Sequence, residues 1–196
     1  MSIAKTSVAV AVAMLFAGAS VAQTTGSTVQ RDVNQQNRIE QGLQSGELTT
    51  HEAGQLERQE ATLEKMQSNA LKDGSLSPAE KARLQRAQNK VSSDVYRDKH
   101  NAALGNPNSA SSKRMQADVQ RNANQQARIE QGVQSGALTN RETASLERGQ
   151  SHVNRAEGRA AADGHVGPAE QANIQARENH QSKRIYRKKH NEAEKS

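Results

Sequence analysis

The chain has 196 residues and a formal net charge of +6. Only 33% of the residues are hydrophobic, 2% are aromatic and none is cysteine, which excludes a disulfide scaffold and a lipid-anchored cysteine. Burying so little apolar surface, at about 25 cal/mol per Å², only modestly offsets the entropy of ordering the chain. The positive charge favours polyanionic partners without specifying one.

Residues 1–22 have the pattern of a cleaved signal peptide. Met1 to Lys5 supplies a short positive start, and Ser7 to Phe16 is an apolar run too short to span a membrane. Ser20-Val21-Ala22 then places small residues before Gln23, where we expect cleavage. The pattern predicts an exported chain with no transmembrane segment. We expect a periplasmic location, with secretion beyond the periplasm as the alternative.

The rest of the chain is a tandem repeat. Gln30 to Asn101 aligns with Gln120 to Asn191 without a gap, and roughly half of the aligned positions are identical. A repeat without insertions is typical of packed helices joined by tight turns. The predicted organisation is a flexible start at 23–28, one helical repeat at 29–104 and a second at 113–191. A Gly-, Pro- and Ser-rich linker at 105–112 separates them, and a charged tail follows at 192–196.

Each copy contains signals for three helices. In the first copy, apolar residues recur from Val29 to Leu43, and Ser45-Gly46 ends that helix. Thr49-x-x-Glu52 is a capping box that starts the second helix, and Asp73-Gly74 ends it. Ser77-Pro78-Ala-Glu80 starts the third. The same devices recur at 135–136, 139–142, 163–164 and 167–170. The sequence therefore predicts an all-α protein of two tandem three-helix units joined by a flexible linker.

Two turns in each copy resemble the second half of an EF-hand calcium loop, with a glycine, an apolar residue two positions later and a closing glutamate. The residues at the first and third ligand positions depart from that pattern; they are Gln41, Asn69, Gln131 and Arg159, and Leu43, Leu71, Val133 and Ala161. The remaining candidate calcium ligands are Glu52, Asp73, Glu80, Glu142, Asp163 and Glu170. Helix capping accounts for the four glutamates without an ion. Calcium binding is therefore the alternative function.

A second string recurs near the end of each copy, at 95–101 and 185–191. A tyrosine, an arginine, a lysine and a histidine gather there at a helix end, and a basic cluster extends the string in the second copy. The candidate surface for an anionic ligand comprises Tyr96, Arg97, Lys99, His100, Lys183, Arg184, Tyr186, Arg187, Lys188, Lys189 and His190. In the structural interpretation, Tyr96 packs on the core, and Lys99 and His100 complement the helix dipole.

Other chemistry has weak support in the sequence. None of the six histidines has a second histidine three or four residues away, so we expect no transition-metal cofactor. We also expect no carboxylate pair in apolar surroundings that would raise a pKa, and there is no nucleophile elbow, which argues against an enzyme. Without an aromatic stacking platform, specific nucleic-acid recognition is not expected.

The ordered motifs Gln-Gln-x-Arg-Ile-Glu-x-Gly, Ser-Gly-x-Leu-Thr-x-x-Glu, Asp-Gly, Pro-Ala-Glu and Ile-Tyr-Arg-x-Lys-His-Asn cover Gln35 to Asn101 and again Gln125 to Asn191. They resemble an uncharacterised family of small exported proteobacterial proteins. The resemblance implies a bacterial, exported, helical protein and implies no activity.

The leading functional hypothesis is a non-enzymatic periplasmic binding protein. Its basic, polar helix faces would meet an anionic envelope polymer or a protein partner. The alternatives are a divalent-metal binding protein that uses the EF-hand-like turns, and an oligomer in which helices with narrow apolar stripes bury more surface against one another.

Overall fold

The computed structural model describes residues 24–191, and all the regular structure in that range is helical. The six α-helices are α1 (Thr25–Ser45), α2 (Thr50–Ala70), α3 (Pro78–Lys99), α4 (Ala110–Gln134), α5 (Asn140–Ala160) and α6 (Pro168–Lys189). A 3-10 turn, η1 (Ala161–Asp163), follows α5. The predicted all-α class is confirmed. The expected signal peptide and charged tail lie outside the described residues.

Side-chain caps set the helix starts where the sequence predicted them. The Thr49 hydroxyl accepts a hydrogen bond from the Glu52 amide at 3.1 Å, and the Glu52 carboxylate accepts from the Thr49 amide at 2.9 Å. Ser77 and Glu80 form the same box at the start of α3. At the other end of α1, Gly46 adopts a left-handed conformation with φ of 79°.

Two helices begin earlier than the sequence predicted. Helix α1 starts at Thr25, inside the segment expected to be flexible, because Thr24 and Ser27 form a capping box. Helix α4 starts at Ala110, inside the expected linker, because Ser109 caps it. The chain before Ser109 is bound to the first copy through a 2.9 Å hydrogen bond from the Gly105 amide to the Gly46 carbonyl. Serine and threonine, taken as signs of flexibility, serve as N-caps at both places.

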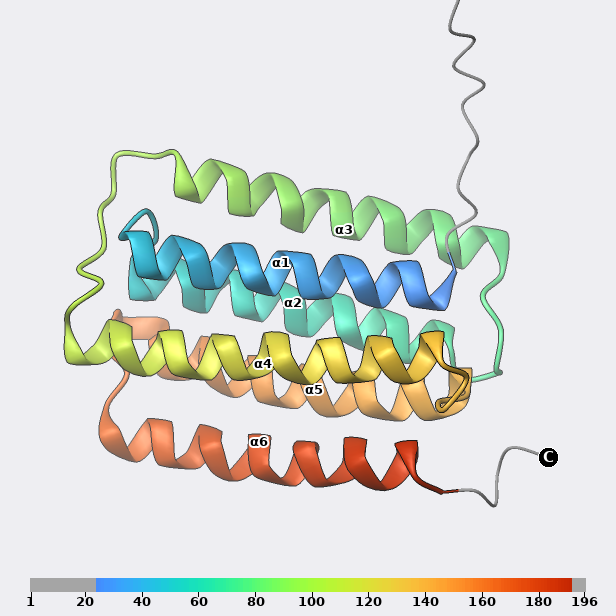
Figure 1. Ribbon diagram of the computed structural model, residues 1–196. Coiled ribbons are helices and arrows are strands. Elements are labelled where there is room, and N and C mark those ends of the chain that lie inside the picture. Colours follow the sequence, from blue (N-terminus) through green and yellow to red (C-terminus); the bar gives the residue numbers. More distant parts are fainter. Residues whose placement is uncertain (1–23, 192–196) are drawn as a thin grey trace, which may run out of the picture.

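The two copies share one bundle, so the expected arrangement of two separate units is not confirmed. Helix α1 packs along α4, and α2 packs along α5, and each pair is antiparallel (Figure 1). These two contacts between copies are the most extensive in the molecule, whereas α3 and α6 lie along opposite edges (Figure 1). The four central helices are therefore α1, α2, α4 and α5.

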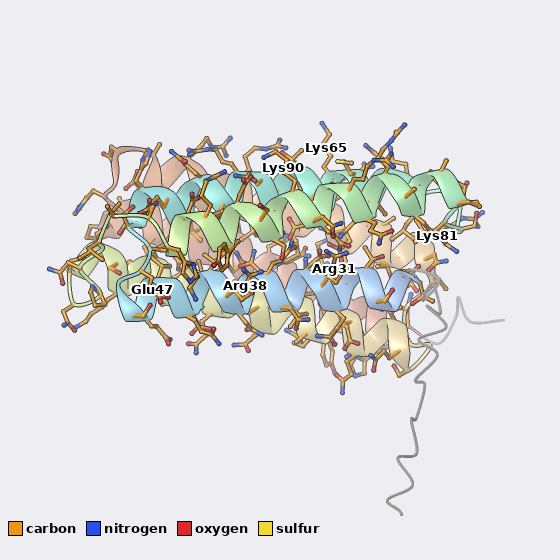
Figure 2. All side chains as sticks on the ribbon, turned by 90° about the horizontal axis from the view of Figure 1, so that it is seen from above. Arg31, Arg38, Glu47, Lys65, Lys81 and Lys90 are labelled. Carbon is orange, nitrogen blue, oxygen red and sulfur yellow. The ribbon has the colours of Figure 1, made fainter. Side chains whose placement is uncertain are left out.

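Arginines attach the outer helices to the centre in the same way in both copies. Arg31 donates to Asn89 at 2.7 Å and Arg38 donates to Ser92 Oγ at 2.8 Å. Figure 2 shows both arginines on the side of α1 that faces α3. The second copy has the equivalent hydrogen bonds from Arg121 to Asn179 and from Arg128 to Ser182, which join α4 to α6.

The apolar core also crosses between the copies. The larger cluster of buried apolar side chains combines Ile39, Leu56 and Leu63 of the first copy with Met115 and Val119 of the second. A smaller cluster combines Val29 with four buried residues of the second copy. Within residues 24–191, no helix has the length and apolar character needed to cross a membrane.

Candidate functional site

A basic groove lies between α5 and α6. The groove has a volume of about 450 Å³ and is lined by Gly149, His152, Val153, Asn173, Ala176, Arg177, His180, Gln181 and Arg184. None of these lining residues is acidic. Arg184 is fixed in the groove wall, because it donates to the Ser145 carbonyl at 2.8 Å and to Gln181 Oε1 at 3.1 Å. An anionic group that entered this groove would meet guanidinium and imidazole groups.

Several arginines lie close enough to His152 to act on its pKa. Burial lowers the pKa of His152, and the positive charges of four arginines lower it further: Arg155, Arg148, Arg177 and Arg184. A site that disfavours one more proton for this reason favours a bound anion, because the anion offsets the mutual repulsion of the cations.

A second groove runs along the other side of α6, against α4. It has a volume of about 550 Å³ and is lined by Arg128, His180, Ser182, Lys183, Tyr186 and Arg187. His180 lines both grooves, so the two adjoin at this residue of α6. This surface, the α6 basic face, consists of the residues that line the two grooves.

The predicted anion surface divides between the two copies. In the first copy, Arg97 is paired with Asp94 at 2.6 Å and with Asp98 at 3.0 Å, and Lys99 is 3.1 Å from Glu47. Those cations are already neutralised. In the second copy, Lys183, Arg184 and Arg187 form no ion pair among residues 24–191, and all three line the α6 basic face.

The remaining predicted residues lie at the ends of α3 and α6. Tyr96 stacks on His100 with ring centroids 4.1 Å apart, and Tyr186 stacks on His190 at 4.2 Å. The interpretation that Tyr96 packs on the core is wrong, because this side chain is 60% exposed. Its ring covers the histidine one turn away.

Lys188 and Lys189 lie away from the centre of the α6 basic face. The Lys188 ammonium is 3.9 Å from the Glu142 carboxylate, and Lys189 donates to the side-chain oxygen of Gln131 at 2.9 Å. Both contacts tie the end of α6 to the helices beneath it.

The candidate calcium ligands bind backbone amides. The carboxylates of Glu52, Glu80 and Glu142 close capping boxes, and Glu170 accepts from the Gly167 amide at 2.8 Å. The two aspartates make turns, with Asp73 accepting from the Ser75 amide and Asp163 from the His165 amide, both at 2.9 Å. Hydrogen bonds lower the pKa of Glu80, chiefly those from the Ser77 side chain and amide. Within the part of the chain that the structure describes, no three His, Cys, Asp or Glu side chains are placed to hold a metal ion.

Sequence reasoning missed a second group of titratable residues, buried at the centre. Six carboxyl groups, each at most 1% exposed, lie between the central helices: Asp32, Glu57, Glu60, Glu64, Glu147 and Glu157. We call them the core carboxyl cluster. The expectation that no carboxylate pair lies in surroundings that raise a pKa is wrong. Burial raises the pKa of Asp32 and of Glu57 to about 7, against the hydrogen bonds that each accepts.

Carboxamides surround the core carboxyl cluster. Gln67 donates to Asp32 at 2.6 Å, and Asn122 donates to Glu157 at 2.6 Å. Gln126 connects the copies, because it donates to Glu64 at 2.9 Å and to Glu147 at 3.2 Å. The signal that would have revealed the cluster is a comparison of the two copies, which exchange acids and amides at these positions.

No family model, curated protein or solved structure matches the chain. The resemblance to an exported proteobacterial family therefore stays a prediction from the motifs.

Proposed function

We propose that the protein is a non-enzymatic, exported binding protein that holds an anionic envelope polymer against the α6 basic face. The observation that carries this proposal is the groove between α5 and α6, where four arginines surround His152 and no lining residue is acidic. The site offers fixed positive charge and long grooves, and it requires no covalent chemistry. Phosphate and carboxylate groups repeated along a chain match that arrangement.

The first copy shows the same fold with less positive charge in the corresponding groove. Its corresponding groove, between α2 and α3, is lined by Gln55, Arg58, Gln59, Thr62, Leu63, Met66, Ala87, Lys90 and Val91. Ala87 stands where the second copy has Arg177, and Thr62 stands where it has His152. The groove of the first copy keeps two cations, Arg58 and Lys90, but Lys90 is paired with Asp94 at 2.6 Å, so the stronger basic character belongs to the second copy.

Retention on heparin–agarose in a salt gradient tests the proposal, with a charge-matched pair of variants. Arg155→Gln with Arg177→Gln removes two of the four positive charges that act on His152 in the basic groove, and Lys65→Gln with Lys90→Gln removes two charges from the first copy, at the positions equivalent to Arg155 and His180. We expect the first variant to elute at clearly lower salt than the second, because only its charges converge on one groove. Equal shifts, or no retention of the natural protein at low salt, would contradict the proposal.

A second readout reports the groove directly. A bound polyanion offsets the positive charge of the four arginines, so the pKa of His152 should rise when polyphosphate is added. Imidazole resonances followed by NMR through a pH titration measure this shift. An unchanged His152 titration beside a bound polyanion would place binding elsewhere.

A further inference from the structure

The core carboxyl cluster has more hydrogen-bond acceptors than donors. The amide groups of Gln36, Gln67, Asn122 and Gln126 donate to the cluster, which leaves the side-chain oxygen of each of these amides without a donor. Both carboxyl oxygens of Glu60 and the Gln150 Oε1 also lack a donor among residues 24–191, while the Gln150 Nε2 lacks an acceptor. An ionised carboxylate only accepts hydrogen bonds, whereas a protonated carboxyl donates one. Protons on the carboxyl groups supply the missing donors.

No cation balances the cluster. Among the described residues, none of the six carboxyl groups forms an ion pair. Arg31 acts on Asp32 through its charge but donates its hydrogen bond to Asn89, and Arg58 donates to the Gly158 carbonyl. Six uncompensated charges in a packed interior are strongly unfavourable, so the groups must be neutral for the copies to pack.

The groups that α3, α4 and α6 place near the core carboxyl cluster include more acids than bases. Helix α3 contributes the neutral Gln88, which donates to Asp32 at 2.9 Å. Helix α4 contributes Asp118 and α6 contributes Glu178, and both act on Glu157 through their charge. Arg121 is 3.3 Å from Glu178, but burial and the charge of Asp118 outweigh it and raise the pKa of Glu178 to about 8.

The two copies exchange acids for amides at buried positions. Residues ninety positions apart pair as Asp32 with Asn122, Glu60 with Gln150, Glu64 with Asn154, Gln67 with Glu157, and Gln88 with Glu178. A carboxylic acid has nearly the shape of a primary amide, and like the amide it combines an acceptor with a donor. Each of these acids therefore occupies a position that also suits a neutral amide, as a protonated carboxyl group would.

We propose that the core carboxyl cluster is a proton-binding switch, and that the two copies pack against each other fully only while most of its six carboxyl groups are protonated. Acidification closes the central bundle, and a rise through neutral pH opens it by releasing those protons. This inference is independent of the polyanion proposal, because it concerns the interior and not the α6 basic face.

The electrostatics of the cluster agree with this direction. Burial raises the pKa of Glu60 well above its ordinary value, and the charges of Asp32, Glu57 and Glu147 raise it further. Glu64, Glu147 and Glu157 are raised in the same way, with burial as the first cause. A carboxyl group whose pKa is higher in the folded state contributes its full stabilisation below its unfolded pKa of about 4. This contribution is lost as the pH rises through its folded pKa.

Urea unfolding followed by circular dichroism at pH 5, 6, 7 and 8 tests the proposal. We expect the folding equilibrium constant to fall at least about 100-fold per pH unit between pH 5 and 7, which corresponds to at least two protons. A constant that changes less than about tenfold per unit would overturn the proposal. So would a loss of stability at pH 7 on adding EDTA, because a divalent cation would then be neutralising the cluster.

Replacing an acid of the cluster with the residue at the equivalent position of the other copy tests which groups bind the protons. Glu60→Gln and Glu64→Asn install the residues found at 150 and 154, and each should make the pH dependence shallower by up to one proton and raise stability at pH 8. The control is Glu80→Gln, which removes an exposed carboxylate and should leave the dependence between pH 5 and 8 as steep as before. Both cluster variants are measured, so that the test still holds if one of them fails to fold. An unchanged slope in the variant that folds would overturn the assignment.

Discussion

The carboxyl groups of Glu57 in α2 and Glu157 in α5 lie close enough across the interface between the two copies for each to act on the pKa of the other. Neither side chain is exposed to solvent. Two ionised carboxylates in this position would repel each other with no water to screen them, so protonation of at least one of them is favoured. The pair therefore couples proton binding to the contact between α2 and α5.

Replacing one member of this pair with its amide should stabilise the protein at alkaline pH. Glu57→Gln keeps the shape of the side chain, supplies a permanent donor to Glu157 and removes the need to protonate a group whose pKa burial raises to about 7. We expect a gain of roughly 1–3 kcal/mol in the free energy of unfolding at pH 8. Gln67, which stands ninety residues before Glu157, shows that the fold accommodates an amide at the position of the other member of the pair, whereas the residue equivalent to Glu57 is Glu147.

Chemical denaturation of the same variant at pH 4 provides its control. The carboxyl group is then protonated in both the folded and the unfolded state, so the variant and the natural protein should differ by less than about 1 kcal/mol. A loss of stability at both pH values would mean that Glu57 acts through its shape or through its negative charge.

The pH profile of stability should have its maximum in mildly acidic solution. Burial raises the pKa of Asp32 from 3.8 to about 7, so this group contributes on the order of 4 kcal/mol below pH 4, which is lost progressively as the pH rises to 7. The caps act in the opposite direction. Hydrogen bonds lower the pKa of Glu80, so its contribution is present above about pH 4.5 and is lost at lower pH.

These opposite slopes place the maximum near about pH 4–5. Thermal unfolding from pH 3 to 9 measures the profile. A maximum at or above pH 7 would show that the core carboxyl groups are stabilised as anions.

Local signals in the sequence were sufficient to predict the helices but not their assembly. Thr49 and Glu52, like Ser77 and Pro78, lie within one helical turn of each other, so capping is readable without tertiary information. The packing of α1 on α4 depends on residues about ninety positions apart, and no local pattern reports it. For the same reason, no local pattern in the predicted linker reports the hydrogen bond that holds Gly105 to Gly46, far earlier in the chain.

The candidate site was predicted in part, from charge alone. The basic run in the second copy identified Lys183, Arg184 and Arg187, which do line the α6 basic face. Charge alone did not reveal that Asp94 and Asp98 neutralise Arg97. The buried acids were missed because a glutamate between polar neighbours on a helix ordinarily faces water. Glu60 is instead fully buried, near acids of both copies, Asp32 and Glu147.

The close approach of α2 to η1, at the end of α5, depends on a glycine. A Cβ atom at Gly54 would lie 2.5 Å from the Ala161 Cβ, so Gly54→Ala should push α2 and η1 apart and cost roughly 1–3 kcal/mol of stability. The second copy has Ala144 at the equivalent position, so the helix itself tolerates alanine there. Equilibrium unfolding in urea at pH 5 measures the loss.

Gly26→Ala is the matched control for this change. Its added Cβ would have no neighbour closer than the 3.7 Å contact with Val133, so the higher helix propensity of alanine should stabilise the protein by up to about 1 kcal/mol. If both alanine variants were equally stable, close packing at Gly54 would not limit the approach of α2 to η1.

The glutamates at the turns should stabilise helix ends without calcium. The Thr49 hydroxyl accepts from the Glu52 amide, so Thr49→Ala should lower the free energy of unfolding by about 1 kcal/mol, with or without calcium. Thr139→Ala removes the same cap from α5 and should cost a similar amount. Urea unfolding and circular dichroism with calcium added to 1 mM or with EDTA measure both effects. A helicity that rises with micromolar calcium, or a Thr49→Ala loss that appears only with calcium, would mean that Glu52 binds an ion rather than the backbone.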